Sequence, residues 1–519
     1  MKFILLAVAA ATVCAQTFPV AGIVVDSESG SAVRRVRVVL ETRPPLTMVT
    51  GDDGKFEFQA PKGKFGFYGE KLGWRQVFGG GFGSAVIAGL DQDTAHLVFR
   101  WYAPGAIYGK VLDDRGDPVA SANVQLIRNP IVNGRRRSIT AGSARTDDRG
   151  YYRFGPIAAG IYYVVAAGEP WYVQPLRFSR GIFPNPANPG PSEPTPGYAP
   201  SYYSNASDPS GASPVVVKPG ADTEADFTLR TITGANLHFS CPNVERCSGS
   251  VSLYGEGING VETLVQQSYA AVMQGMGGIP PGRYVVHFSG TGGSMRKPID
   301  VGAGDLSVEL APQAAPSVLG KVAFKNPDAK PKRPIYVRMV NQETGAAIAR
   351  AVEPDGSFTW SRLAVANYRP EIGSVEGFFA EQVSVEGAPA HDGVIDVAEG
   401  ASIRLNIVVS DEAGRLKGFV MNAEKPVPAA LVLLASVKDT PDSAPYLGFQ
   451  TDSDGSFDFT SVRAGDYHLF ALESTEGVEY ANPAVIRPYF TGSLVVHIEA
   501  HKTQEQNLSV SVPARSPVP

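Results

Sequence analysis

Apolar and polar residues alternate along most of this chain in short runs, and turns rich in Gly, Pro and Asp separate the runs. Runs of about five to eight residues with every second position apolar are typical of half-buried β-strands. Segments with the 3.6-residue spacing of an amphipathic helix are hard to find. The pattern therefore predicts an all-β protein.

One phrase recurs: an Asp-rich turn ending in Gly, a strand with alternating aromatic residues, a tight loop and a second aromatic strand. Its first half is found at Thr50–Phe58, Thr146–Phe154, Glu353–Trp360 and Thr451–Phe459, and a fifth repeat keeps only the second half, at Ile279–Val286. Asp bonds to nearby backbone groups in turns, and Gly supplies positive φ. We interpret the phrase as a hairpin that sets the strand register, repeated in tandem modules.

The strand expected to open a repeat carries a glycine near its centre. These strands lie at 20–26, 105–113, 317–324 and 414–421, with Gly22, Gly109, Gly320 and Gly418 inside them. A glycine inside a strand indicates a bulge or the close approach of another backbone.

Each repeat has room for six or seven short antiparallel strands in about 80 to 125 residues, the count and spacing of a Greek-key β-sandwich. Because 519 residues exceed what one core usually supports, we expect several domains. The predicted division is a signal peptide at 1–15 and β-sandwiches at 16–102, 103–230, 231–313, 314–409 and 410–519, with a long loop at 169–214 in the second and a divergent third module.

The order of these elements resembles the carboxypeptidase regulatory-like family: opening strand with Gly, polar turn, second strand, T-x-D-x-G-x-[FY]-x-F, loop, then G-x-Y. The resemblance implies a prealbumin-like (transthyretin-like, Ig-like) sandwich, similar also to Cna-B-type adhesin repeats and to modules with a carbohydrate-binding-like fold. It covers most of the chain and is weakest in the third module. It implies an exported, cell-surface bacterial protein and no particular reaction.

The N-terminus has the layout of a secretory signal peptide, with Lys2, an apolar run from Phe3 to Val13, and small residues up to Ala15. The run is shorter than the roughly 20 residues that a membrane-spanning helix needs. A lipoprotein anchor at Cys14 is an alternative that the flanking residues fit less well. We expect cleavage after Ala15 and export to the periplasm, the cell surface or the medium, with no membrane span in the mature chain.

The cleaved chain retains two cysteines, Cys241 and Cys247. An exported pair this close together is most simply a disulfide. It lies in the third module, which lacks the Asp turn, and a bridge there can secure the strands instead. The net charge of −5, spread over 519 residues, predicts no binding to nucleic acid.

The residues offer little chemistry for catalysis. The chain has seven histidines and neither a His-Glu-x-x-His nor a Gly-x-Ser-x-Gly motif, so we expect no enzyme, no metal and no cofactor. Turn carboxylates such as Asp147 and Asp148 could gather around calcium, but they lead straight into Gly and a strand rather than along a calcium loop. Isopeptide cross-links of the Cna-B type, from Lys110, Lys321 or Lys417, are a further alternative.

Aromatic residues are the best indication of a binding site. The long loop of the second module contains Trp171, Tyr172, Tyr198, Tyr202 and Tyr203. Sugars stack on exposed Trp and Tyr rings, whose apolar faces end in a polar edge. The same residues could instead pin the loop to the sandwich. The basic run Arg135–Arg137, between two strands of this module, is expected at a solvated hairpin tip.

These observations predict a non-catalytic secreted or cell-surface protein that acts as a scaffold, adhesion or interaction module. The first alternative is a carbohydrate-binding protein that uses the loop aromatics. The second is an accessory to an export or peptidase system. The expected partner is a glycan or a surface protein.

Overall fold

The computed structural model describes residues 16–76, 85–88, 94–173, 195–242, 247–270, 275–373, 375–437, 446–452, 454–473 and 478–511. The predicted signal peptide at 1–15 lies outside these residues. Within them the regular structure is β-strand, apart from one α-helix, α1 (Pro483–Phe490), and the short 3-10 helices η1 (Pro209–Gly211) and η3 (Ile258–Gly260).

The strands form five β-sandwiches of two facing sheets each, which we number in chain order. The first contains β1 (Thr17–Asp26), β2 (Arg37–Leu40), β3 (Leu46–Val49), β4 (Lys55–Pro61), β5 (Gly63–Glu70), β6 (Arg75–Gln76), β7 (Ala85–Ala88) and β8 (Leu97–Tyr102). The second contains β9 (Gly105–Asp113), β10 (Asn123–Arg128), β11 (Ile131–Val132), β12 (Arg135–Arg136), β13 (Ile139–Arg145), β14 (Tyr151–Ile157), β15 (Gly160–Ala167), β17 (Ser201–Tyr202), β18 (Val215–Val217), β19 (Asp222–Glu224) and β20 (Phe227–Leu229).

The third contains β16 (Thr195–Tyr198), β21 (Thr231–Ser240), β22 (Gly249–Gly255), β23 (Thr263–Ala270), β24 (Met276–Ile279), β25 (Gly282–Gly290), β26 (Gly293–Val301) and β27 (Leu306–Glu309). The fourth contains β28 (Ser317–Phe324), β29 (Tyr336–Asn341), β30 (Ala347–Ala351), β31 (Ser357–Trp360), β32 (Ala366–Ile372), β33 (Phe379–Glu386), β34 (Ala390–His391), β35 (Val394–Val397) and β36 (Ser402–Ser410). The fifth contains β37 (Ala413–Asn422), β38 (Lys425–Pro426), β39 (Leu431–Ser436), β40 (Leu447–Gln450), β41 (Ser456–Arg463), β42 (Gly465–Leu472), β43 (Leu494–Ile498), β44 (Thr503–Glu505) and β45 (Leu508–Ser509), together with α1.

One pairing scheme repeats in every sandwich. In one sheet the opening strand lies between an antiparallel hairpin strand and a parallel closing strand. From the first sandwich to the fifth, these orders are β4-β1-β8; β14-β9-β19; β24-β21-β27; β31-β28-β36; and β41-β37-β44. The closing strand continues as β20 in the second sandwich and as β45 in the fifth. In the other sheet the second strand lies between two antiparallel neighbours: β3-β2-β5, β13-β10-β15, β23-β22-β25, β30-β29-β32 and β40-β39-β42.

The prediction of tandem all-β sandwich modules is therefore confirmed, with one correction. The sequence predicted only antiparallel pairs, whereas the opening and closing strands of each sandwich run parallel. Alternating polarity shows that a segment is a strand but does not show which distant strand lies beside it, or in which direction.

The glycine near the centre of the opening strand lies where the closing strand approaches. A Cβ on Gly22 would collide with the carbonyl oxygen of Leu97 on β8. A Cβ on Gly418 would collide in the same way with the carbonyl oxygen of Gln506, and Gly109 faces another carbonyl oxygen. The predicted close backbone approach is confirmed at these three positions.

The Asp–Gly phrase forms the predicted hairpin turn. The Asp147 carboxylate accepts the backbone N–H groups of Arg149 and Tyr151 at 2.9 and 2.8 Å, and Gly150 has φ +77°. Equivalent carboxylate bonds run from Asp53 to the N–H of Lys55, from Asp355 to that of Ser357, and from Asp454 to that of Ser456. In these turns one carboxylate oxygen therefore bonds local backbone, the role that the hairpin interpretation gave to the Asp residues.

The threonine that begins the phrase ties the turn to the connection between the opening and second strands. Thr146 Oγ1 accepts the N–H of Ala122 at 2.8 Å and donates to the carbonyl oxygen of Val119 at 2.6 Å. The same two bonds are made by Thr50, to Val36 and Val33, and by Thr451, to Ala430 and Val427. All three threonines are buried, and we call this arrangement the threonine clamp.

The third and fourth sandwiches hold the same connection in other ways. A disulfide joins Cys241 to Cys247 and closes the link between β21 and β22, and Cys247 belongs to the hydrophobic core. In the fourth sandwich Val352 takes the place of the threonine, and its N–H donates to the Ile335 carbonyl oxygen at 2.9 Å. The Thr146 N–H donates in the same way to the Ala122 carbonyl oxygen, at 3.0 Å. The fourth sandwich therefore keeps this backbone bond and lacks only the two bonds of the threonine hydroxyl.

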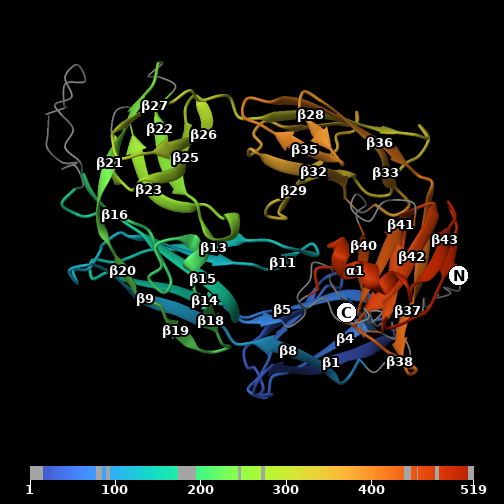
Figure 1. The fold of residues 1–519 in the computed structure, drawn as a ribbon. Coiled ribbons are helices and arrows are strands. Elements are labelled where there is room, and N and C mark those ends of the chain that lie inside the picture. Colours follow the sequence, from blue (N-terminus) through green and yellow to red (C-terminus); the bar gives the residue numbers. More distant parts are fainter. Residues whose placement is uncertain are drawn as a thin grey trace, which may run out of the picture.

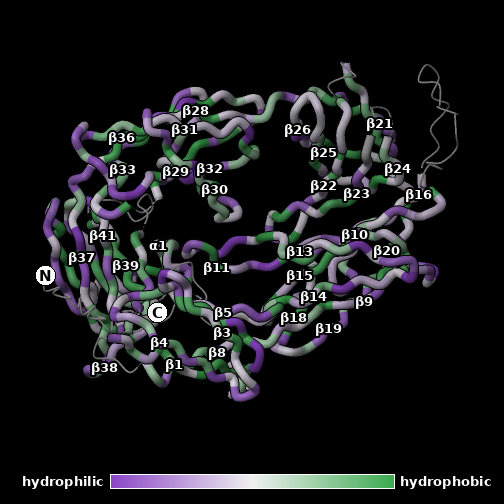
Figure 2. Tube along the Cα trace, turned by 180° about the vertical axis from the view of Figure 1, so that it is seen from behind, coloured by the Kyte–Doolittle hydropathy of each residue, from purple (hydrophilic) through white to green (hydrophobic). Residues whose placement is uncertain are grey.

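Each sandwich has its own hydrophobic core between its two sheets. Figure 2 shows hydrophobic and hydrophilic positions mixed along the strands, as expected for strands with one buried and one exposed face. The recurring G-x-Y tyrosine fixes one corner of the core: Tyr162, Tyr284 and Tyr467 each donate to a carbonyl oxygen four residues earlier, at 2.8, 2.8 and 2.9 Å. The third sandwich thus keeps this corner although it lacks the Asp turn.

The five sandwiches follow one another around a ring, and the fifth lies beside the first (Figure 1). The ring closes through an ion pair between Lys64 on β5 and Asp452, whose side chain is almost fully buried. The Lys64 ammonium also lies 5.5 Å from the centre of the Phe449 ring on β40. The ammonium gives the buried Asp452 carboxylate a counter-charge, and the Phe449 ring adds a cation–π contact.

A hairpin formed by β11 and β12 reaches from the second sandwich to the fourth and fifth (Figure 1). Its turn, Asn133 and Gly134, has φ +50° and +73°, as Asn-Gly turns favour. Gly134 accepts the N–H of Ala481 at 2.9 Å, and Asn133 Nδ2 donates to the Gly345 carbonyl oxygen at 3.3 Å. The prediction that Arg135–Arg137 form a solvated hairpin tip holds in part: Arg135 and Arg136 are exposed, but they lie in β12 rather than at the tip, and Arg137 is only 9% exposed.

Replacing Thr146 by Val should destabilise the second sandwich by about 1–3 kcal/mol, because two buried hydrogen bonds are lost with little change in volume. Native-state hydrogen exchange of amides in β9, β10 and β14 measures that free energy. Thr359→Val, on an exposed position of β31, is the matched control and should change it by less than about 0.5 kcal/mol. Equal losses in both variants would show that the clamp contributes nothing.

Replacing Gly134 by Val should displace the hairpin from the fifth sandwich. A Cβ there would lie 2.5 Å from the Tyr480 ring. Exchange of the Ala481 amide should accelerate by about tenfold or more, the equivalent of 1.4 kcal/mol. Gly116→Ala introduces similar strain at φ +89° but meets nothing within 4 Å, so it should leave that amide protected. Unchanged protection in the Val variant would contradict the docking.

Candidate functional site

The predicted loop at 169–214 is partly built into the third sandwich. Its strand β16 pairs antiparallel with β21, from Thr195 opposite Gly234 to Tyr198 opposite Thr231. The prediction treated the whole segment as irregular, because four residues containing Pro and Gly show no alternation. One sheet of the third sandwich therefore includes β16, although β16 comes before the last strands of the second sandwich in the sequence.

Side chains of β10 form a second set of contacts between the second and third sandwiches. Gln125 Nε2 donates to the Glu262 carbonyl oxygen at 3.1 Å, and Gln125 Oε1 accepts the N–H of Leu264 at 3.3 Å. Asn123 Nδ2 donates to the Leu264 carbonyl oxygen at 3.3 Å. Ile258 of η3 adds apolar contact by packing with residues of β10, β15 and β17. The position of the third sandwich against the second is thereby set by both backbone and side chains.

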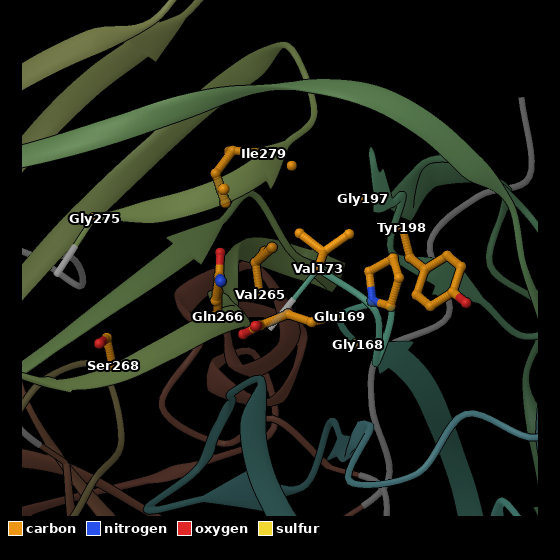
Figure 3. A pocket seen from close by; sticks show the side chains of 13 residues that line it. Gly168, Glu169, Val173, Gly197, Tyr198, Val265, Gln266, Ser268, Gly275 and Ile279 are labelled. Carbon is orange, nitrogen blue, oxygen red and sulfur yellow. The ribbon is translucent and has the colours of Figure 1, made fainter. Parts of the chain in front are cut away.

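Between these two lines of contact lies a cleft, which we call the junction cleft. Its outer part has a volume of about 230 Å³, and its lining includes Ser121, Asn123, Arg145 and Glu169 from the second sandwich and Gln266 and Gln267 from the third. Its inner end is a cavity of about 30 Å³, and five of its lining residues are glycines. The cavity has room for about two water molecules. Figure 3 shows the Glu169 side chain reaching toward Gln266 at this inner end.

Two of the predicted site residues stand exposed beside this cleft. Trp171 is 77% exposed and Tyr172 is 51% exposed, and they follow directly after Glu169 and Pro170, which line the inner cavity. Their rings meet edge to face, with centres 5.8 Å apart. The pair therefore offers apolar ring surface next to a polar cleft.

The other three predicted aromatics hold the segment in place. Tyr198 and Tyr202 are each only 4% exposed. The Tyr202 hydroxyl donates to the Glu256 carbonyl oxygen at 2.9 Å, and that of Tyr198 donates to Asp113 at 3.3 Å. Burial raises the pKa of both phenols, and Asp113 raises that of Tyr198 further. Tyr203 packs edge to face on Phe227. Tyr198 and Tyr202 therefore fit the alternative in which the loop aromatics pin the segment to the sandwich.

The polar lining of the cleft was missed in the sequence. Asn123 and Gln125 look like ordinary strand residues, and Gln266 lies in another module. The packing of the third sandwich against the second brings these residues together. A polar residue at an apolar strand position, such as the nearly buried Gln125, is the one signal that could have marked the interface.

A wider hollow of about 700 Å³ lies between the fourth and fifth sandwiches. Lys325 at its edge pairs with Glu381 and Glu412 at 3.1 and 2.8 Å. The Arg463 guanidinium lies 5.2 Å from the centre of the Phe379 ring. The contact of Arg463, in the fifth sandwich, with Phe379, in the fourth, crosses the junction, so we assign the hollow to the packing of the two sandwiches.

The described ranges contain no cluster of three or more His, Cys, Asp or Glu side chains that could hold a metal ion. They also contain no helix that is long and apolar enough to cross a membrane. Of the lysines considered for isopeptide bonds, Lys417 pairs with Glu505 at 2.6 Å, and the Lys110 ammonium lies 4.5 Å from the centre of the Tyr151 ring. Both contacts lie at the surface rather than in a core.

No protein-family model and no curated protein matches the chain. Among solved structures, it is similar to the TIE protein of Bacillus anthracis, with 11% identity, 76% of this chain and 68% of that chain covered, and a TM-score of 0.16. It is also similar to the shaft pilin SpaA of Lactobacillus rhamnosus GG, with 9% identity, 42% and 98% covered, and a TM-score of 0.20.

A third similar structure is GBS52, the minor pilin of Streptococcus agalactiae, with 17% identity, 40% and 99% covered, and a TM-score of 0.15. Because these TM-scores are low, the description of the fold rests on the strand pairing of this chain and not on the likenesses.

Proposed function

We propose that this chain is a non-catalytic, exported interaction scaffold, in which five fixed β-sandwiches hold a binding surface at the junction cleft. The observation that carries the proposal is the exposure of Trp171, at 77%. A tryptophan normally buries most of its surface. Exposed aromatic surface beside a polar cleft is typical of recognition sites.

The surroundings of Trp171 support a binding role rather than a flexible tail. The segment that bears it leaves β15 at Ala167 and at once lines the cleft with Gly168 and Glu169. Three further tyrosines of the same loop, Tyr198, Tyr202 and Tyr203, are packed against the sandwich or its neighbour. A ligand at the cleft would therefore meet a surface whose shape is largely set before binding, which lowers the entropic cost of association.

A carbohydrate is the ligand that the cleft chemistry favours. Amide, hydroxyl and charged groups from Asn123, Ser121 and Arg145 can exchange hydrogen bonds with sugar hydroxyls. The rings of Trp171 and Tyr172 can stack on the apolar face of a sugar. The resemblance of the repeats to modules with a carbohydrate-binding-like fold supports the same choice. A protein partner at the cell surface is the other candidate, and it too would use the exposed aromatic pair.

Trp171→Ala should weaken glycan binding at least tenfold, and Tyr172→Ala should weaken it several-fold, because each removes stacking surface. Both residues are exposed, so the melting temperature should change by no more than about 2 °C. The measurement is a glycan array followed by calorimetric titration of the best ligand. Tyr336→Ala, at a 47% exposed position in the fourth sandwich, is the matched control and should bind as the unaltered protein does.

Binding that survives Trp171→Ala would show that the cleft is not the site. An array without any ligand, together with a surface protein whose binding depends on Trp171, would favour the protein partner. Hydrolysis of any arrayed glycan or of a peptide library by the purified chain would contradict the non-catalytic part of the proposal.

A further inference from the structure

A buried arginine whose Nε atom has no acceptor lies at the base of the hairpin that bridges the ring. Arg137, directly after β12, is only 9% exposed, and its Nε atom is fully enclosed. No described residue accepts a hydrogen bond from that Nε. A Cβ on Gly345 of the fourth sandwich would lie 3.3 Å from it, so the guanidinium is covered by the turn of a different module.

The charges around Arg137 do not neutralise it. Its neighbour Arg136 has a carboxylate partner, because Arg136 Nε donates to Glu479 at 2.9 Å. No ion pair joins Arg137 to a carboxylate among the described residues, although Glu343 lies two residues from Gly345 on an exposed position. Burial lowers the pKa of the Arg137 guanidinium, and Arg135 lowers it further. An arginine nonetheless stays protonated in a protein.

An unpaired buried charge is costly, and proteins normally pair it or bind a counter-ion to it. Three more exposed arginines of the described chain illustrate the rule, because each contacts a carboxylate: Arg153, Arg296 and Arg415. A water molecule could accept one hydrogen bond from Arg137 but would leave the charge uncompensated. An anion at the guanidinium would compensate the charge.

We propose that Arg137, assisted by Arg135, binds a tetrahedral oxyanion, a phosphate or sulfate group, at the junction of the second and fourth sandwiches. The planar guanidinium matches the spacing of two such oxygens, and a second arginine nearby adds charge. The group could be the free ion or an ester on a polymer. Arg137 and Arg135 are not among the residues that line the junction cleft, and the proposal does not depend on what that cleft binds.

Occupancy would also stabilise the ring. An anion at Arg137 offsets the charge that the docked hairpin buries, so it should favour the state in which the hairpin lies against Gly345. The free protein should therefore melt at a higher temperature when the ion is present, by mass action.

The test is calorimetric titration of the purified mature chain with sodium phosphate and with sodium sulfate, with sodium chloride at equal ionic strength as the blank. We expect saturable binding of one ion per chain. Arg137→Gln should weaken it at least tenfold and abolish the rise in melting temperature. Arg404→Gln, on an exposed position of β36, is the matched control and should bind as the unaltered chain does.

Absence of saturable binding in the unaltered chain would overturn the proposal, and so would equal binding by Arg137→Gln. If Arg137→Gln does not fold, Arg137→Lys keeps the positive charge but lacks the planar guanidinium, so it should bind the ion several-fold more weakly. Unchanged affinity in the Lys variant would also contradict the proposal. A comparison of dextran sulfate with dextran and with free sulfate distinguishes an ester on a polymer from the free ion. Binding at least tenfold tighter per sulfate identifies the ester, whereas equal affinity identifies the free ion.

Discussion

The parallel pairing of the opening and closing strands determines how the rest of this molecule is built. When the first and last strands of a sandwich are parallel neighbours, the chain enters at one end of the sheet and leaves at the other. An antiparallel pair would return it to the end where it began. The links are also short: β8 ends at Tyr102 and β9 begins at Gly105, and β20 ends at Leu229 just before β21 begins at Thr231. Successive sandwiches must therefore follow one another end to end.

The same pairing restricts one position of the opening strand to glycine, and it leaves one connection between the sheets that needs additional bonding. The restricted position is the glycine of the opening strand, where the backbone of the closing strand leaves no room for a Cβ. The connection that needs bonding is the one that crosses from the opening strand to the other sheet, because backbone there leaves the ladder. Three sandwiches secure it with a threonine clamp, the third with a disulfide, and the fourth with backbone bonding at Val352. Different side chains thus solve one problem that the topology imposes.

Local features of this fold could be predicted from the sequence, and distant pairings could not. The Asp147–Gly150 turn was predictable because its carboxylate and its positive φ act within a few residues. The crowding at Gly22 could be inferred as a close approach, but not its partner Leu97. The pairing of β16, the burial of Tyr198 and the docking of Gly134 each depend on residues in another part of the chain. For the site, composition identified the loop, and only the three-dimensional structure separated the two exposed rings from the packed ones.

The closed ring has a mechanical consequence. Lys64 and Asp452 are 388 residues apart in sequence and are in contact. A pulling force applied to the two ends of the chain would not at first pass through the series of sandwiches, because the first and the fifth are joined directly. It would load that ion pair and the hairpin at Gly134 before any sheet is stretched. Once those contacts break, the ring would open and the molecule would lengthen in one step into a row of sandwiches. Every hydrophobic core would stay folded during that extension.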